Sequence, residues 1–523
     1  MKYIRRATLF SGIRPNLNIE EKEVAPLEDK RLGSLWQTEK CPEFPRFTGE
    51  SAAQAVILGG GLCGLLCAYE LLQNGVKDIV LLEARKLCSG TTARTTAKIT
   101  AQHGLIYHKL IRGAGFQRAK QYADANRQAI SRYREIIEKE KIDCDFIPCE
   151  AYLFARDREG AQKIQEEAKA ARRLSLDADV VTECELPFRI QAALRFPGQA
   201  RFHPLKFAYG LAEILRRNGV RIYQGSEALA LDDGVVYTRD GNLYGKNILI
   251  CTHYPFMNQR GLYFSHIVQS VSYTAVLEGP QKLNGMYLDC APGGDSFRSQ
   301  PWQGKDLLLL GRFDHKTGHE TAVPHFRLLE EEAQKLYPGS TVRFLWSAQD
   351  CMTGDCIPYY IGRYRQLKGN VFLAAGFNKW GMTGCMAAAG ILSRMVTGGK
   401  ETPVFSPRRS DLRMQAPALL RGARDTAASF LKDYFAPPGK NLSSLKNGEG
   451  ALAEYRGSKI GAYRDEEGSL HGVNPVCAHM RCPLQWNPEE HTWDCPCHGS
   501  RYDKDGKVIE NPACHPLEHK GPD

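Results

Sequence analysis

Two cysteine–histidine pairs near the end of the 523-residue sequence have a spacing that suits metal binding. They are Cys477 with His479, spaced C-x-H, and Cys495 with His498, spaced C-x-x-H. Two thiolates on one iron and two imidazoles on the other make a [2Fe–2S] centre whose potential the histidines raise. The alternative is a Cys₂His₂ zinc site, which has ligand pairs of the C-x₂-C and H-x₃-H type. Because each pair here mixes the two residue types, we expect the iron–sulfur cluster.

The residues around these four ligands resemble the Rieske proteins of the cytochrome type. Cys482 and Cys497 occupy the positions where those proteins place a disulfide that clamps the two cluster loops. Ser500 and Tyr502 match the hydroxyls that hydrogen-bond the cluster sulfurs there. Such bonds stabilise the reduced cluster, so the resemblance implies a potential in the upper part of the Rieske range.

The sequence departs from that pattern at two positions. Ala478 and Arg481 stand where Thr and Gly are usual. Arg481 puts the backbone of the first loop in question, because a glycine at that place supplies a positive φ. A free-thiol state of Cys482 and Cys497 also stays open in a reducing compartment.

A nucleotide motif lies near the other end of the chain. Residues 55–58 form a short apolar segment, followed by G-x-G-x-x-G at Gly59, Gly61 and Gly64 and by an apolar helix that ends near residue 74. Gly59 permits the tight turn, Gly61 lets the backbone approach a pyrophosphate, and Gly64 lets the helix pack on the strand. The phosphates then lie at the positive end of the helix. Glu83 ends the next strand and is placed to accept hydrogen bonds from ribose hydroxyls.

Small and hydroxyl-bearing residues follow this acid, and residues 374–384 form a late glycine turn that opens a helix. Over roughly residues 50–400 the sequence resembles the D-amino-acid-oxidase-like FAD oxidoreductases, which include glycine, sarcosine and γ-glutamylputrescine oxidases. The resemblance implies FAD, with the first motif at its ADP half and the late turn at its isoalloxazine end. The predicted cofactor residues are Gly59, Gly61, Gly64, Glu83, Thr91, Thr92, Gly376, Trp380, Gly381, Met382 and Thr383. Only one dinucleotide motif is visible, so a second domain for NAD(P)H is not indicated.

The predicted fold is an α/β FAD-binding Rossmann-like domain with an interleaved α+β substrate domain, followed by an all-β Rieske domain. Long helices are expected at 116–141, 157–176, 204–218 and 383–396, and strands with turns fill most of 180–346. The predicted domains are an arm (1–50), a body (51–400), a linker with one helix (401–442) and the Rieske domain (443–523). Within the body, the FAD lobe takes about 51–141, 202–257 and 348–400, and the substrate lobe about 142–201 and 258–347.

Composition limits the classes of protein that fit. No apolar run approaches the ~20 residues of a membrane span, and the first 17 residues lack the apolar core of a signal peptide. The 17 cysteines, an odd number without an export signal, favour a reducing cytoplasm. The net charge of +10 is uneven, since residues 437–523 are slightly acidic and the rest is basic. No Lys/Arg-rich run with interleaved aromatics suggests nucleic acid.

The motifs together predict an enzyme that oxidises an amine, an amino acid or a related small molecule at FAD and passes electrons singly to the cluster. Two alternatives stay open: a reductase in which electrons run from cluster to flavin, and a non-catalytic redox sensor or electron-transfer adaptor. The partners expected are a small-molecule substrate and an unidentified electron acceptor or donor. No catalytic residue is identified; Arg298 is a candidate either for a substrate carboxylate or for a structural ion pair.

Overall fold

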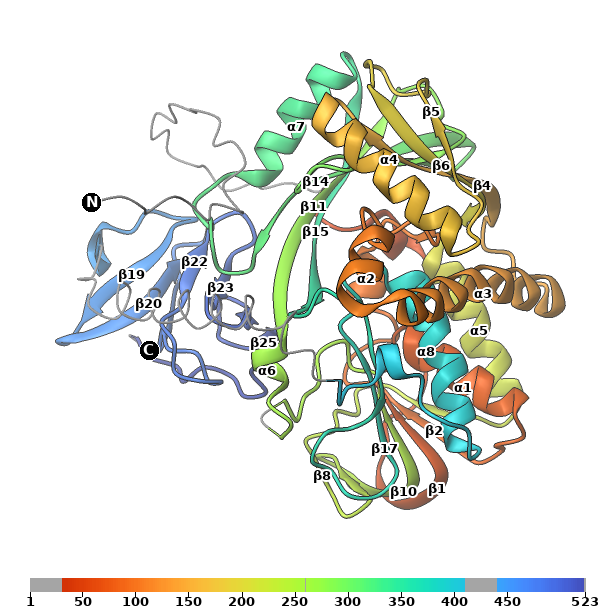
Figure 1. The fold of residues 1–523 in the computed structure, drawn as a ribbon. Coiled ribbons are helices and arrows are strands. Elements are labelled where there is room, and N and C mark those ends of the chain that lie inside the picture. The colour runs from red at the N-terminus through yellow and green to blue at the C-terminus, as the bar shows by residue number, and fades with distance from the viewer. Residues whose placement is uncertain (1–30, 259, 410–439, 522–523) are drawn as a thin grey trace, which may run out of the picture.

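The computed structural model describes residues 31–258, 260–409 and 440–521. These residues form a body with two large sheets and a smaller β domain beside it (Figure 1). The helix expected within the linker falls at 418–435 and so lies outside the described residues. Of the N-terminal arm, the described part packs on the body: Trp36 is fully buried and donates a hydrogen bond to the Thr95 carbonyl over 2.7 Å.

The first sheet carries the nucleotide motif. Its strand order is β16-β17-β10-β1-β2-β7, and β9 and β8 extend it from β10. The central strands are parallel and buried on both faces, which explains their continuous apolar runs. The strands are β1 (Gly49–Leu58), β2 (Ile79–Leu82), β7 (Arg221–Tyr223), β8 (Ala230–Asp232), β9 (Val235–Tyr237), β10 (Gly241–Ile250), β16 (Tyr360–Arg363) and β17 (Val371–Ala375).

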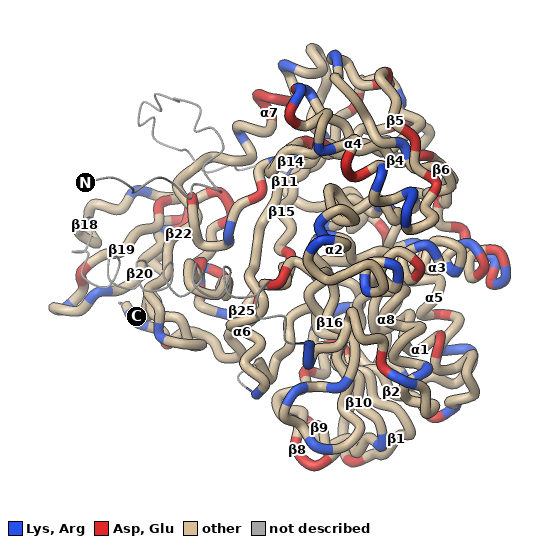
Figure 2. Tube along the Cα trace, in the orientation of Figure 1, with Lys and Arg blue, Asp and Glu red and all other residues tan. Residues whose placement is uncertain are grey.

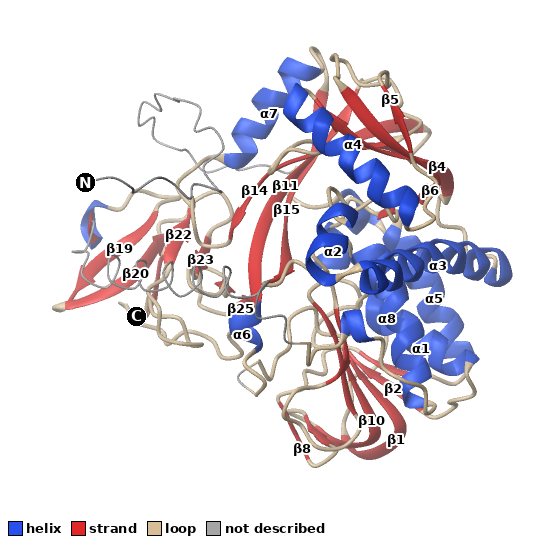
Figure 3. Cartoon of the chain, viewed as in Figure 1, coloured by secondary structure: helices blue, strands red, loops and turns tan. Residues whose placement is uncertain are grey.

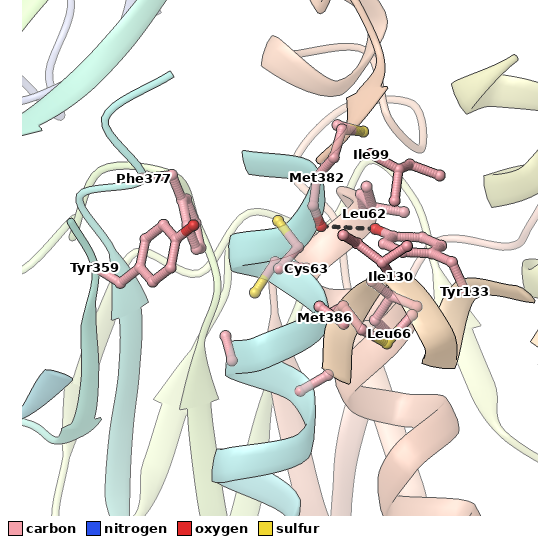
Figure 4. Packing of buried hydrophobic residues seen from close by; sticks show 14 of the residues in the cluster. Leu62, Cys63, Leu66, Ile99, Ile130, Tyr133, Tyr359, Phe377, Met382 and Met386 are labelled. Atoms are coloured by element: carbon pink, nitrogen blue, oxygen red, sulfur yellow. Dashed lines mark hydrogen bonds between the residues drawn. The ribbon is translucent and has the colours of Figure 1, made fainter. Parts of the chain in front are cut away.

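Helices cover one face of this sheet, as Figure 3 shows. They are α1 (Leu62–Gln73), α3 (Phe116–Glu140), α5 (Pro204–Arg217) and α8 (Gly381–Val396), and α2 (Tyr107–Ala114) packs on α3. Because α1 packs against the sheet, α8 and α5, its residues from Leu62 to Leu71 are all buried. At the start of α8 the Tyr133 hydroxyl of α3 donates to the Met382 carbonyl over 2.8 Å (Figure 4). The predicted helices near 116–141, 204–218 and 383–396 are confirmed.

The second sheet is mixed and has the order β15-β11-β14-β13-β12-β4-β6-β3, with β5 on β6. Helices α4 (Arg158–Arg173) and α7 (His325–Leu336) pack on it, and the short α6 (Tyr263–His266) leads into β11. Helix α7 was not predicted, because its segment was assigned to strands and turns. The strands are β3 (Lys98–Ile99), β4 (Ile147–Ala155), β5 (Asp179–Val181), β6 (Ala192–Arg201), β11 (Ile267–Glu278), β12 (Met286–Asp289), β13 (Ser296–Trp302), β14 (Lys305–Lys316) and β15 (Thr341–Thr353).

The C-terminal domain consists of two small sheets, β18-β19-β20-β21 and β22-β23-β24-β25. Its strands are β18 (Lys440–Asn441), β19 (Gly450–Tyr455), β20 (Ser458–Arg464), β21 (Leu470–Val473), β22 (Gln485–Asn487), β23 (Thr492–Asp494), β24 (Arg501–Tyr502) and β25 (Val508–Glu510). Its core includes the fully buried Trp493 and Tyr502. The predicted fold class is therefore confirmed, whereas the domain boundaries stay a prediction.

Charged residues of both signs are mixed over the body and the C-terminal domain, as Figure 2 shows. None of the described helices is both long and apolar enough to cross a membrane. The cytoplasmic location stays a prediction.

Candidate functional site

A cavity of about 550 Å³ lies between the two sheets of the body. One wall comes from the turn after β1, the end of β2 and the start of α8; the other comes from β11, β14 and β15 of the second sheet. The crevice beyond the carboxyl ends of parallel strands is where open α/β sheets bind their ligands. The cavity therefore lies where the nucleotide motif predicts a cofactor.

The three motif glycines have different structural roles. Gly59 has φ +105°, and a Cβ there would lie 2.5 Å from the Cys251 carbonyl oxygen. A Cβ at Gly64 would lie 2.0 Å from the Gly59 carbonyl oxygen, so that glycine lets α1 pack on the turn. Gly61 is different: its Cβ would meet just one atom within 4 Å, the Thr92 Oγ1 at 3.3 Å, and it faces the cavity. Bare backbone at this point is what a pyrophosphate needs for close approach.

Glu83 and the two predicted threonines line the cavity next to this turn. The Glu83 carboxylate accepts the backbone amides of Gly60 over 2.7 Å and Arg85 over 2.8 Å, which fixes it at the end of β2. The Thr92 hydroxyl accepts the Leu62 amide at the N-terminus of α1 over 3.1 Å. A carboxylate held by backbone amides in this place is suited to ribose hydroxyls.

Of the predicted FAD residues, eight line the cavity and three stand behind its wall. Those that line it are Gly59, Gly61, Glu83, Thr91, Thr92, Trp380, Gly381 and Met382. Gly64, Gly376 and Thr383 brace it instead: Gly376 has φ +69° against Thr353, and the Thr383 hydroxyl donates to the Thr100 carbonyl over 3.2 Å. Their roles toward FAD stay a prediction, and the geometry of the cavity fits the cofactor.

Several polar residues that were not predicted as site residues also line the cavity. Lys98, His253, Asp350 and Lys379 line the cavity, and Lys379 pairs with Asp314 over 2.8 Å. Burial raises the pKa of Asp350, and the positive charge of Lys379 opposes that shift. Lys379 lies in the predicted late turn next to Trp380, whereas no local pattern identifies Lys98 and Asp350, since strands from separate parts of the chain bring them together.

Arg298, the candidate for a substrate carboxylate, is fully buried within the second sheet. It donates to the Ala97 carbonyl over 2.8 Å and to the side-chain oxygen of Gln300. Neither partner is a carboxylate, and Arg298 is not part of the cavity lining. Its contacts are those of a structural residue, although not of the ion pair that was the alternative.

The four predicted cluster ligands come together from two loops of the C-terminal domain. The rings of His479 and His498 lie 5.2 Å apart, and their Nδ1 atoms are buried without a hydrogen-bond partner in the described structure. Burial lowers the pKa of both imidazoles to about 4, so they are neutral as metal ligands must be. Two unpartnered imidazole nitrogens beside two buried thiols fit a [2Fe–2S] cluster.

One of the two thiols of this site, that of Cys477, is polarised toward ionisation. Hydrogen bonding with Cys495, then with Tyr502 and Ser500, lowers the pKa of Cys477 to about 6, against the opposing effect of burial. The pKa of Cys495 is raised, because a thiolate at Cys477 holds the neighbouring thiol in its protonated form. The Tyr502 hydroxyl lies 3.3 Å from the Cys477 Sγ and accepts the Ala478 amide over 3.0 Å.

The structure answers both questions that the sequence left at the cluster loops. Cys482 and Cys497 form a disulfide, with Cα atoms 6.6 Å apart. Arg481 adopts φ +57°, so an arginine takes the left-handed conformation that a glycine usually supplies. The loop geometry is thus preserved despite the substitution.

One face of strand β15 lines the cavity, and its other face lies against the cluster domain. Ala348, Asp350 and Met352 line the cavity. The alternate residues face the cluster domain: Ser347 donates to Glu490 over 2.5 Å, and the Gln349 amide donates to the Gly499 carbonyl over 2.9 Å. Successive side chains of a strand point to opposite faces. A single strand layer therefore stands between the cavity and the loop that carries His498.

Further hydrogen bonds hold the cluster loops on the body. Gln269 of β11 donates to the His498 carbonyl over 3.1 Å and also bonds Gln349. The His479 Nε2 donates to the Asn258 Oδ1 over 2.8 Å, which leaves Nδ1 of that ring for the metal. Phe264 of α6 lies edge-on to both ligand rings. The histidine side of the cluster loops thus packs against the body, and Figure 1 shows the C-terminal domain beside β11, β15 and α6.

Comparison with known families agrees with both sites. A family model described as FAD dependent oxidoreductase matches residues 54–395, and one described as Rieske [2Fe-2S] domain matches residues 438–520. The chain therefore belongs to the family of FAD-dependent oxidoreductases and carries a C-terminal Rieske domain. Its cofactors are FAD and a [2Fe–2S] cluster, as predicted.

Individual relatives extend this result. A Bacillus subtilis (strain 168) protein named as a Rieske 2Fe-2S iron-sulfur protein is 36% identical over 495 residues, which cover 93% of this chain and 97% of that one. The γ-glutamylputrescine oxidoreductase of Escherichia coli (strain K12) is 27% identical over 219 residues, 40% of this chain and 51% of that one. The structure of glycine oxidase from Geobacillus kaustophilus superposes with TM-score 0.58 at 18% identity, covering 69% of this chain and 99% of that one. This likeness shows the fold of the body.

Proposed function

We propose that the protein oxidises an amine, an amino acid or a related small molecule in the body cavity and passes the electrons singly to its own cluster. The relatives named above support the substrate class, because an oxidoreductase of γ-glutamylputrescine and an oxidase of glycine both act on amines. Bound FAD would supply two-electron oxidation, and the cluster would supply one-electron transfer. The proposed function is thus a dehydrogenase of an amine, an amino acid or a related small molecule, with an internal electron acceptor.

One observation carries the proposal: Gln349 contacts the cavity wall and the cluster loop at once. Its carbonyl accepts hydrogen bonds from two cavity-lining residues, from His253 over 3.1 Å and from the Thr91 hydroxyl over 3.4 Å. Its side chain bonds the Gly499 carbonyl next to the ligand His498. Asn511 of the cluster domain also lines the cavity. This arrangement favours transfer within one molecule over transfer between separate proteins.

Anaerobic mixing of the purified protein with a panel of amines and amino acids tests the proposal. We expect an amine to bleach the flavin absorption and then to produce the EPR signal of a reduced Rieske cluster. The rate of cluster reduction should be independent of protein concentration, because this step takes place within one molecule. Cluster reduction that slows on dilution would refute the internal route, and a flavin that becomes reduced only after the cluster would favour the reductase.

A further inference from the structure

Lys98 occupies a distinctive place in the cavity wall. It begins β3, the edge strand of the second sheet, and its side chain lines the cavity. The same strand leads to Thr100, whose carbonyl accepts the hydroxyl of Thr383 in the first turn of α8. The lysine therefore lines the same cavity as the turn of Trp380–Met382, which the family resemblance assigns to the isoalloxazine end of FAD. An amine in this position is close to where substrate and flavin must meet.

The partners of this amine are all neutral. Nζ donates to the Ser296 hydroxyl over 2.6 Å and to the Tyr287 carbonyl over 2.8 Å. In the described parts of the chain no carboxylate forms an ion pair with Lys98. By contrast, Lys379 of the same cavity pairs with Asp314. The environment of Lys98 therefore does little to stabilise the charged form of its side chain.

The neighbouring groups make that charge still less favourable. Burial first, and then the Arg298 guanidinium of β13, lower the pKa of Lys98 to about 7, while the Cys149 thiol of β4 acts weakly in the other direction. Arg298 is held close, since it donates to the carbonyl of Ala97, the residue before the lysine. Near neutral pH a large fraction of this side chain is thus an uncharged amine with a free lone pair.

We propose that Lys98 is the proton acceptor for an amine substrate that enters the cavity as its ammonium form. This inference rests on the function proposed above and specifies its substrate class. The N–H bond of the ammonium breaks and its proton moves to Nζ, which gives a neutral substrate amine and a charged lysine. The hydrogen of the substrate C–H bond would then leave together with the bonding electron pair, as a hydride, to bound oxidised FAD, and a C=N bond would form. The lysine returns its proton to solvent when the iminium product leaves.

A base with a pKa of about 7 suits this proton transfer. A general acid or base is most effective when its pKa lies near the working pH, and contributes roughly 10²–10⁴-fold to a rate. An alcohol would also have to lose its O–H proton when its hydride leaves, so the choice of an amine rests on the function proposed above. The position and the neutral contacts of Lys98 support its role as a proton acceptor.

Substitution of Lys98 tests the proposal in the holoenzyme. Lys98→Met removes the base, Lys98→Arg keeps a permanent charge, and Lys305→Met on the exposed part of β14 is the matched control. In the wild type the anaerobic rate of flavin bleaching by an amine should rise with pH through about 7. Both Lys98 variants should bleach at least ~100-fold more slowly, while flavin content and bleaching by dithionite stay unchanged. A wild-type rate in Lys98→Met would overturn the proposal; restoration by Lys98→Arg would assign the residue an electrostatic role instead.

A second readout needs no substrate. Because the charged lysine is unfavourable in the folded protein, Lys98→Met should raise the melting temperature most at about pH 6, and the gain should shrink toward pH 9. A gain in melting temperature that does not vary with pH would show that Lys98 stays charged and cannot accept a proton. The two proposals fail separately: if no amine bleaches the wild type, the proposed function is refuted, whereas equal bleaching of wild type and Lys98→Met refutes just the role of Lys98.

Discussion

The Tyr502 hydroxyl offers a sharp test of how the protein sets the cluster potential. It lies 3.3 Å from the Sγ of the ligand Cys477, on a side chain that is fully buried. A hydrogen bond to a ligand sulfur stabilises the reduced cluster, which carries more negative charge. A bond worth ~1 kcal/mol corresponds to about 40 mV for a one-electron couple. Tyr502→Phe should therefore lower the midpoint potential by about that amount.

Redox titration followed by EPR measures this shift. The same hydroxyl also accepts the Ala478 amide over 3.0 Å, so the variant should lose about 1–3 kcal/mol of stability as well. Tyr463→Phe is the control, because its hydroxyl bonds His491 rather than a cluster ligand. A potential that stays unchanged in Tyr502→Phe, with the expected loss of stability, would show that the hydroxyl serves only to hold the loop.

Three further predictions concern the flavin, the first cluster loop and the contact between domains. Gly61→Val should abolish FAD retention because its side chain would enter the pyrophosphate position, and Glu83→Ala should weaken retention less; flavin content of the purified variants decides. Arg481→Gly should raise the free energy of unfolding by ~0.5–1 kcal/mol, since φ +57° strains an arginine but not a glycine, and thermal unfolding measures it. Gln349→Leu should slow reduction of the cluster by the flavin without changing flavin bleaching, and a further Gln269→Leu should add little, because the two side chains form one bonded pair. Stopped-flow absorption resolves both steps, and strictly additive effects would contradict the pairing.

The parts of the fold that could be predicted from the sequence are those whose contacts join residues close together in the chain. The turn from β1 into α1 joins residues that are neighbours in sequence, so its glycine spacing reports its geometry directly. The two cluster loops likewise carry their ligands at fixed short spacings. Helix α7 was missed although Phe326, Leu329 and Ala333 share one buried face, a helical period that was overlooked among the neighbouring strands.

The residues that connect the two sites could not be predicted in this way. Gln269 lies 229 positions from His498, and Gln349 lies 150 positions from Gly499. Glutamine has no motif for such a contact, and each of the two stands in a strand of the second sheet. Lys98 was missed for the same reason: its neutral partners come from β12 and β13, far along the chain. These residues come together because strands that are distant in the sequence pair in the second sheet, and no local sequence pattern reports that pairing.

The burial pattern of β15 is explained by what lies on its two faces, the cavity on one and the cluster domain on the other. A half-exposed strand alternates apolar and polar residues, but in β15 the residues from Leu345 to Gln349 are all buried and include two polar side chains. Ser347 and Gln349 are buried because the cluster domain covers that face, and they are polar because they bond its backbone and its Glu490. The opposite face must stay open to the cavity. A shift of one residue in the register of β15 would exchange the two sets of side chains, so the same strand pairing with β11 that shapes the cavity also fixes the position of the cluster loop.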